Sequence, residues 1–274
     1  MEAALPIQKA RIHSIDILRG IIMILMALDH VRAYMSNSPI DPLDLSKTSA
    51  ILFFTRWITH FCAPTFLFLS GTSAYLSLSK KKSTKEASRF LLTRGLWLIF
   101  LELTVIGFGW QFDIGFHSIL AQVIWVIGWS MIILSALIYL KPIYVGLLGL
   151  ILIFGHNAFD FVKAGSFGNY KVLWMFLHEQ NIYQINHYES IFILYPLVPW
   201  VGIMAVGYAF GTLFKFEAAV RRSLFIKIGL SSLLVFIILR YFNIYGDPLP
   251  WQQQTVWWKD ILSFVKCHKN PPLL

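Results

Sequence analysis

Long apolar segments alternate with short polar connections along the whole chain. The apolar segments cover residues 15–35, 50–79, 89–110, 118–140, 143–160, 191–214 and 223–243. A bilayer core about 30 Å thick is crossed by roughly 20 residues of α-helix, and each segment approaches or exceeds that length. The pattern therefore predicts an all-α fold: a polytopic membrane bundle of about seven spans that forms a single domain over residues 1–274.

The composition agrees with a membrane protein and excludes an ordinary soluble globular class. Of the 274 residues, 57% are hydrophobic and 14% are charged, and the mean hydropathy is +0.64. The first span does not resemble a cleaved signal peptide, because it begins late, carries charges and is not followed by a small-residue cleavage site. The ending Pro271–Leu274 resembles the start of another span, so we expect a C-terminally truncated chain whose last spans are missing.

Basic residues indicate the orientation. Lys9 and Arg11 precede the first span, the loop 80–89 is the most basic connection, and Lys141 and the stretch 215–222 fall on the same side. The positive-inside rule makes this side cytoplasmic, so we expect an integral multi-pass protein with a cytoplasmic N-terminus, in the plasma (inner) membrane if the source is bacterial. The rule also accounts for the net charge of +9. We therefore expect the lipid bilayer as a partner and no nucleic acid.

Ionisable residues inside the first span are the strongest functional signal. Arg19 and His30 are eleven positions apart, so in a helix they project within about 20° of each other, separated by about 16 Å. Asp16 can pair with Arg19, and Asp29 with Arg32 on another face. A charge at membrane depth costs about 2.5–3.5 kcal/mol on insertion scales, which makes each one a functional-site hypothesis. The structural alternatives are an interfacial ion pair for Asp16 and Arg19, and a satisfied core histidine for His30.

Further polar side chains gather towards the outer side of the predicted bundle. They are Arg56, His60, Glu102, His117, His156, Asn157, Asp160, His178 and His187. Imidazoles collected on one side favour proton-transfer chemistry there. We expect no metal site, because HExxH and close His-x-His spacings are absent and Cys62 and Cys267 lack metal-ligand spacing. The nucleophile elbow and the phosphate-binding glycine patterns are also absent from the sequence.

Two other residue types predict packing rather than chemistry. The tryptophans Trp200, Trp251, Trp257 and Trp258 are typical of the aromatic belt at a membrane interface. The glycines Gly71, Gly202, Gly207 and Gly211 are typical of close contacts between membrane helices.

Several stretches resemble a known family. They are RIHSIDILRGIIMILMALDHVRAY, HFCAPTFLFLSGTSAYL, FLELTV, VIWVIGWSMI, GHNAFD and YPLVPWVGIMAVGYAFG. Together they are similar to bacterial relatives of heparan-α-glucosaminide N-acetyltransferase, over nearly the whole chain. More distantly, Arg19 and His30 resemble the Arg-x10-His signature of acyltransferase-3 membrane proteins. The resemblance implies an acyltransferase-like membrane domain that transfers an acetyl or other acyl group from cytoplasmic acyl-CoA, with acetyl-CoA as the donor, to an extracytoplasmic sugar or glycan.

The resemblance also suggests roles for the candidate residues. The lysosomal enzyme uses a histidine in the loop after its first span, but this sequence has no histidine between Val31 and Thr59, and Asp41 stands at the corresponding spacing. The base would then be His30, deprotonating a hydroxyl or an amine of the acceptor. The other expected roles are orientation or charge balance of the base by Asp29 and Glu102, acceptor binding by Arg56, His60, His156 and Asn157, and binding of CoA phosphates by Arg19 and Arg94, with Lys81 and Lys82 nearby.

Alternatives remain open at this point. The same charges suit a proton-coupled transporter or exporter of a small polar solute, although no inverted repeat is visible. A non-enzymatic membrane scaffold would not need so many ionisable groups within its spans. Asn157 is also a candidate helix cap, the loop lysines are also topology signals, and association into a homodimer is undecided.

Overall fold

The computed structural model describes residues 13–35, 40–78, 81–243 and 250–266. Its α-helices are α1 (His13–Met35), α2 (Ala50–Thr59), α3 (Cys62–Leu78), α4 (Thr84–Leu101), α5 (Gly107–Gln111), α6 (Val123–Leu137), α7 (Pro142–Gly155), α8 (Lys171–Leu177), α9 (Leu197–Phe210), α10 (Ala218–Phe242) and α11 (Trp257–Val265). Shorter elements are the π-helical turn η1 (Glu102–Ile106), the 3₁₀ helices η2 (His156–Phe159), η3 (Ala164–Tyr170) and η4 (Gly211–Lys215), and the strands β1 (Ser118–Ala121), β2 (Asn181–Gln184) and β3 (Ser190–Ile193). Lys9, Arg11 and Cys267 lie outside the described residues.

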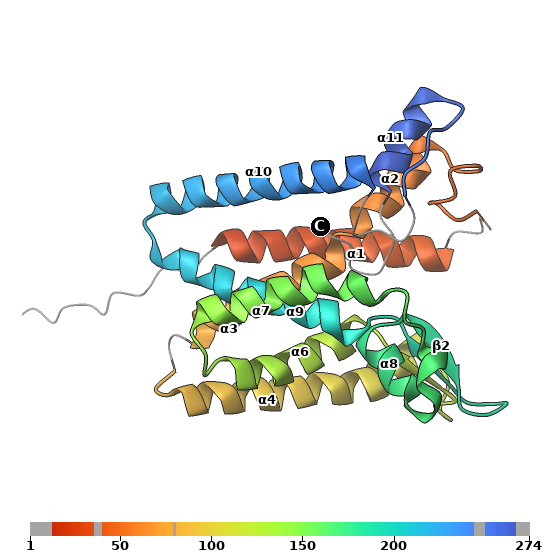
Figure 1. Ribbon diagram of the computed structural model, residues 1–274. Coiled ribbons are helices and arrows are strands. Elements are labelled where there is room, and N and C mark those ends of the chain that lie inside the picture. The colour runs from red at the N-terminus through yellow and green to blue at the C-terminus, as the bar shows by residue number, and fades with distance from the viewer. Residues whose placement is uncertain (1–12, 36–39, 79–80, 244–249, 267–274) are drawn as a thin grey trace, which may run out of the picture.

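Several helices join end to end into segments that are long and apolar enough to cross a membrane. The described residues contain five such segments: Ala50–Leu78, Thr84–Gln111, Pro142–Phe159, Leu197–Lys215 and Ala218–Phe242. The apolar helix α6 is shorter, with 15 residues, and α1 has 23 residues but is interrupted by charged side chains. The long helices run side by side between two ends of the molecule (Figure 1). These findings confirm an integral membrane protein with an all-α bundle, and each of the seven predicted spans overlaps one of these helical segments.

Two of the predicted spans begin later than expected, because their first residues form strands. Residues 118–121 and 190–193 pair in parallel, and β3 also pairs with β2 in antiparallel orientation, which gives the strand order β1-β3-β2. The helices α6 and α9 therefore begin at Val123 and Leu197. A short apolar run fits a strand as well as the end of a buried helix, so periodicity could not separate the two.

The segment between α7 and α9 contains α8 and two of these strands, β2 and β3, and it lies at one end of the bundle, where α8 and β2 are labelled in Figure 1. We call residues 161–195 the end layer. Ala164, Met175 and Ile193 form its buried apolar cluster, and the indole of Trp174 donates a hydrogen bond to the carbonyl of Val162 at 3.0 Å. The sequence predicts a loop for most of this segment, whereas the structure shows a packed layer.

Asp113 holds the connection that leads from α5 into β1. Its carboxylate accepts the backbone N–H of His117 at 2.8 Å and that of Gly115 at 2.9 Å, and it contacts His117 Nδ1 at 2.9 Å. The hydrogen bonds from His117, first from its backbone and then from its ring, hold the pKa of the Asp113 carboxyl below its usual range. Asp113 is therefore ionised at neutral pH and keeps this connection closed.

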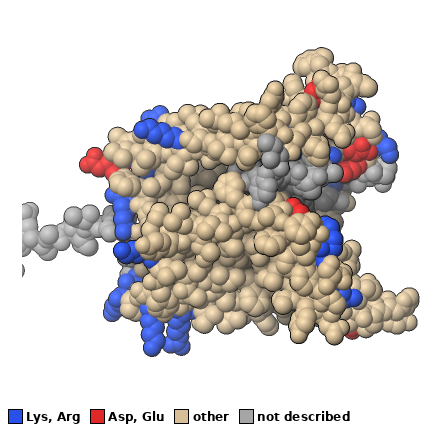
Figure 2. Space-filling view, in the orientation of Figure 1, with Lys and Arg blue, Asp and Glu red and all other residues tan. Residues whose placement is uncertain are grey.

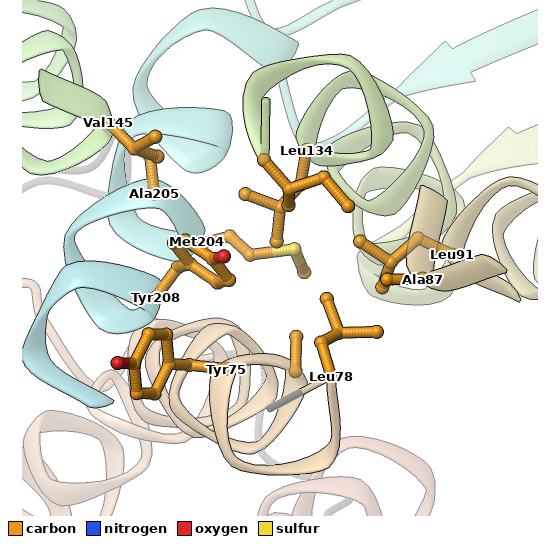
Figure 3. Close-up of a cluster of buried hydrophobic side chains, with 11 residues drawn as sticks. Tyr75, Leu78, Ala87, Leu91, Leu134, Val145, Met204, Ala205 and Tyr208 are labelled. Atoms are coloured by element: carbon orange, nitrogen blue, oxygen red, sulfur yellow. The ribbon is translucent and has the colours of Figure 1, made fainter. Parts of the chain in front are cut away.

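The main core lies around α9. Figure 3 shows Met204 at the centre of this core, facing Leu134 of α6 and the neighbouring side chains of α3 and α4. In the most apolar 18 residues of each segment, 56% of the α9 segment is buried and none of the α10 segment is; Arg240, near the end of α10, is buried. The bundle therefore has a packed centre formed by α3, α4, α6, α7 and α9, with α10 outside it.

Glycines allow the core helices to approach each other closely. A Cβ placed on Gly71 of α3 would lie 2.1 Å from the carbonyl oxygen of Met204, and one on Gly207 would lie 2.2 Å from that of Phe68. The same holds between α7 and α9, where a Cβ on Gly149 would lie 2.7 Å from the carbonyl oxygen of Gly202. Small residues at such crossings allow the van der Waals packing that drives association of helices in lipid.

Basic side chains gather at the end of the bundle where α4 and α10 begin. Most of the Lys and Arg side chains visible in Figure 2 lie there. The exposed members of this group include Lys82, Lys85, Arg89, Lys141, Lys215 and Arg222. The two ends of the bundle therefore differ in charge, with the end layer at the end opposite to this basic one.

We expect Gly71→Ala to destabilise the protein, because the added methyl group has no room between α3 and α9. Overpacking of this kind costs about 1–3 kcal/mol, and each kcal/mol lowers the melting temperature of a chain of this size by about 2–4 °C. Thermal unfolding in detergent measures the effect. Gly229→Ala on α10 is the matched control, since a Cβ there meets no atom within 4 Å; equal melting temperatures for the two variants would contradict the packing argument.

Candidate functional site

A cavity of about 220 Å³ lies where α6 and α9 begin. It is lined by Met26, Asp29, His30, Arg56, Trp57, Thr59, His60, Phe61, Cys62, Ala63, Pro64, Glu102, Ile106, Trp110, Gln122, Val123, Ile124, Tyr195 and Trp200. Because β1 leads into α6 and β3 leads into α9, this is the end of the bundle that carries the end layer. Of the predicted site residues, the cavity collects His30, Asp29, Glu102, Arg56 and His60.

Interrupted helices surround the cavity. The helix that starts with α2 breaks after Thr59, and α3 begins at Cys62. The helix that starts with α4 passes through the π-helical turn η1, whose first residue is Glu102. Such turns are frequent at functional sites, and irregular backbone at membrane depth is tolerated where it is buried in protein or lines a cavity. The interruptions therefore mark this region as a site rather than a packing contact.

Asp29 is the centre of an ionic network that joins α1 to α2. Arg56 Nη1 contacts both carboxylate oxygens, at 3.0 and 2.9 Å, and Thr59 Oγ1 donates to Oδ1 at 2.9 Å. Arg32 also pairs with Asp29, which confirms the pair predicted within α1. Although Asp29 and His30 project from different faces of α1, both line the cavity. Asp29 thus pairs with two guanidinium groups, of which that of Arg56 lines the cavity.

The imidazole of His30 lies beside aromatic rings. Its ring centroid is 5.1 Å from that of Trp110, in an edge-to-face arrangement, and Trp110 also stacks on Tyr34 at 5.3 Å. Aromatic contacts of this kind hold a ring in one orientation without using its nitrogen atoms. The His30 nitrogens are not engaged by Asp29, whose oxygens are occupied by Arg32, Arg56 and Thr59.

Glu102 brings a buried carboxyl group to the same cavity. Its side chain is 1% exposed, and its Oε1 accepts the backbone N–H of Gln122 at 3.2 Å. Gln122 is the N-cap of α6, and the N-terminus of a helix favours a negative charge. The backbone N–H of Trp125, in the first turn of α6, also faces this carboxyl, but Oε2 is buried and makes no hydrogen bond of ordinary geometry with the described residues. Buried polar groups are nearly always paired, so this oxygen is a candidate contact for a ligand.

A comparison with known protein families can now be set beside this geometry. The family model described as heparan-alpha-glucosaminide N-acetyltransferase, catalytic, matches residues 11–242, most of the chain. The chain belongs to this family. No curated protein and no solved structure matches it. Heparan-α-glucosaminide N-acetyltransferases are membrane N-acetyltransferases that use acetyl-CoA as the acetyl donor.

Four of the residues predicted to bind substrates do not line the cavity: Arg19, Arg94, His156 and Asn157. Arg19 donates to Ser73 Oγ at 2.6 Å and lies 3.9 Å from Asp16, so it joins α1 to α3. Arg94 is exposed on α4 and covers the ring of Phe90 at 4.5 Å. Their contact with CoA phosphates stays a prediction.

The other two residues, His156 and Asn157, belong to a separate polar cluster between α7 and the end layer. His156 Nδ1 contacts the carbonyl of Ile153 at 2.7 Å, which makes Nδ1 the donor of that hydrogen bond. Asn157 donates to Asp160 at 2.9 Å, and Asp160 in turn lies 3.2 Å from His178 Nε2. The cluster links the end of α7 to α8. Acceptor binding by His156 and Asn157 stays a prediction.

Several residues of the cavity were not predicted from the sequence. Trp200 was expected in an interfacial belt, but this is wrong, since its side chain is 4% exposed and lines the cavity. Thr59, Trp110 and Gln122 line it as well. The sequence contains no signal that separates a buried tryptophan near a helix N-terminus from a belt tryptophan. Among the described residues, no group of three or more His, Cys, Asp and Glu is placed to hold a metal ion.

A second and larger space opens between α10 and the bundle. This apolar groove has a volume of about 690 Å³. Its lining runs from Ser14 and Phe214, at the end where the basic side chains gather, to Ile203 and Pro64, and Pro64 also lines the cavity. No residue that lines the groove is ionisable. The groove and the cavity are therefore adjacent and differ sharply in polarity.

We expect Asp29 and Arg56 to be energetically coupled. Asp29→Asn leaves two guanidinium groups without their carboxylate, and Arg56→Gln removes a bidentate partner, so each variant should lower the free energy of unfolding. In the double variant the loss should be smaller than the sum, with a coupling of about 1–3 kcal/mol. Denaturation in detergent micelles measures the free energy of unfolding of the wild type, the two single variants and the double variant.

A surface pair serves as the control for this cycle. Lys81 and Glu86 lie 3.4 Å apart, and Glu86 is half exposed, so Lys81→Gln and Glu86→Gln should couple by about 0–1 kcal/mol. A coupling at Asp29 and Arg56 no larger than that of the control pair would show that the network does not join α1 to α2.

Proposed function

We propose that this protein transfers an acetyl group from acetyl-CoA to a hydroxyl or amine of a sugar or glycan acceptor, inside the cavity that His30 and Glu102 line. The observation that carries the proposal is the buried Glu102 carboxyl, with one oxygen unpartnered, in a cavity shared with an imidazole. A buried group of this kind costs stability unless a ligand uses it. In a chain of the heparan-α-glucosaminide N-acetyltransferase family, the acyl acceptor is a suitable ligand, because its hydroxyl or amine can donate a hydrogen bond to this carboxyl oxygen.

His30 is the general base in this proposal. As the acceptor oxygen or nitrogen forms a bond to the thioester carbonyl carbon, its proton passes to the imidazole. The carbon–sulfur bond then breaks, and the leaving CoA thiolate takes that proton back. Glu102 balances the charge of the imidazolium, and Asp29 instead holds Arg56 and Arg32 in place. Arg56 and His60 contact polar groups of the acceptor.

The donor enters from the basic end, which we take as cytoplasmic by the positive-inside rule, so the N-terminus of α1 is cytoplasmic too. The apolar groove leads from this end to Pro64 at the cavity wall, and it suits the acyl-pantetheine arm. The guanidinium of Arg221 covers the ring of Phe214 at 5.3 Å, and Phe214 lines the groove. This places a cation near the entrance for CoA phosphates.

The acceptor approaches from the opposite, extracytoplasmic end, where the end layer lies next to the cavity. The guanidinium of Arg56, which lines the cavity, favours acceptors with electronegative or anionic groups. The histidines and Asn157 of the neighbouring cluster are within the same end of the bundle and contact more distant parts of a glycan in this proposal.

We expect His30→Ala and Glu102→Gln to lose acetyl transfer while keeping donor binding. Loss of a general base or of its charge partner lowers kcat by about 10²- to 10⁴-fold. Purified protein with labelled acetyl-CoA and a panel of amino sugars and glycans measures transfer, and equilibrium binding of CoA should change by less than about twofold because neither residue contacts the nucleotide.

The controls are His187→Ala and Glu217→Gln, two exposed residues outside the cavity, which should transfer as fast as wild type. Wild-type rates in the His30 variant would contradict its role as base. Solute uptake into proteoliposomes without any CoA thioester would instead support a transporter.

A further inference from the structure

The indole of Trp200 is a hydrogen-bond donor without a partner at the cavity. Trp200 lies in the first turn of α9, its side chain is 4% exposed, and it lines the cavity. Its Nε1 is buried and has no hydrogen-bond partner among the described residues. Indole has a donor and no acceptor, so only an oxygen or nitrogen lone pair of another molecule can satisfy it there.

The ring of Trp200 is held firmly. It packs in a buried cluster with Leu67, Val126 and Ile203, and it contacts the ring of Tyr195 edge-to-face at 4.9 Å. A donor fixed by packing does not need to reorganise when a charge develops next to it, which is the property of an effective oxyanion-stabilising group. The N-terminus of α9 adds a positive partial charge on the same side.

Two other tryptophans provide a comparison within the same protein. Trp125 and Trp129 of α6 also have a buried Nε1 without a partner among the described residues. Neither lines the cavity, and their rings contact each other at 5.6 Å. An unpaired indole is therefore not special in itself; what distinguishes Trp200 is its place at the cavity wall.

Two residues of the cavity wall therefore each carry a buried polar atom without a partner among the described residues: the donor Trp200 Nε1 and the acceptor Glu102 Oε2. Acyl transfer uses both kinds of group, because the carboxylate balances the charge of the base that takes the proton, while a donor stabilises the negative charge that develops on the carbonyl oxygen. We propose that Trp200 donates its indole N–H to the carbonyl oxygen of the acyl thioester and stabilises the oxyanion of the tetrahedral intermediate. This inference rests on the proposed acetyltransferase function.

The step is balanced without any further reactant. The acceptor lone pair forms a bond to the carbonyl carbon, and the π electrons of the carbonyl move to its oxygen, which Trp200 then stabilises. Collapse of the intermediate restores the carbonyl and breaks the carbon–sulfur bond. CoA leaves as a thiolate and is protonated by the group that received the acceptor proton.

Trp200→Phe tests this role, because it removes the N–H and keeps an aromatic ring. We expect kcat to fall by about 10²-fold, which is typical for loss of one oxyanion donor, with the KM for the acceptor changed by less than about threefold. Trp129→Phe is the matched control and should remain within about twofold of wild type in both values.

A binding measurement separates this role from a structural one. The probe is the acetyl-CoA analogue in which a methylene group replaces the thioester sulfur, so that the carbonyl stays in place and cannot be transferred. Trp200→Phe should weaken binding of this analogue by about tenfold, as expected for one lost hydrogen bond, and leave the affinity for CoA itself unchanged. Trp129→Phe should change neither affinity.

The outcomes distinguish the inference from the function on which it rests. A wild-type protein that transfers no acetyl group to any acceptor would contradict the proposed function. An active wild type with equal kcat in Trp200→Phe and Trp129→Phe would contradict the role of Trp200 alone, and would indicate that its indole binds only a buried water molecule. If Trp200→Phe does not fold, benzothienylalanine at position 200, in which sulfur replaces the N–H with little change of shape, decides the same question.

Discussion

The ion pair between Asp29 and Arg56 is the contact on which the site depends. A charge within the bilayer is expensive unless it is paired, so neither the carboxylate of α1 nor the guanidinium of α2 is stable there without the other. Their contact, at 2.9 Å, ties α1 to the break between α2 and α3. Because His30 follows Asp29 directly in the helix, the same contact also fixes His30 at the cavity wall.

The other walls of the cavity are formed where the bundle encloses irregular backbone. A π-helical turn and a helix break expose polar groups that lipid cannot satisfy, so they are stable only where protein encloses them. The close glycine contacts of α9 with α3 and α7 provide a packed core behind them. The polar cavity and the tight core are thus two parts of one arrangement: the core fixes the helices, and the interruptions at one end open the space between them.

The sequence allowed the fold class to be predicted, because long apolar runs and their basic connections carry that signal directly. It also singled out His30, Glu102 and Arg56, since ionisable residues stand out in an apolar segment. It could not identify Arg56 as the partner of Asp29, because that pair joins residues 27 positions apart on different helices. The strands were missed because such short, partly apolar runs of four residues fit a strand or a helix equally well. Trp200 was misassigned because burial and interfacial position look alike in one sequence.

The polarity of the two spaces favours transfer over transport. A small polar solute crossing the membrane needs polar groups along its whole path, yet the 690 Å³ groove is lined mainly by apolar side chains, with a few hydroxyl groups and no ionisable residue. Ionisable groups line the 220 Å³ cavity instead, and this cavity meets the groove at Pro64. An acyl arm is the part of a donor that suits an apolar groove, while the cavity is too small for a nucleotide. On the proposed function the acetyl group alone passes from one side to the other, and the dry groove keeps water away from the thioester until the acceptor is bound.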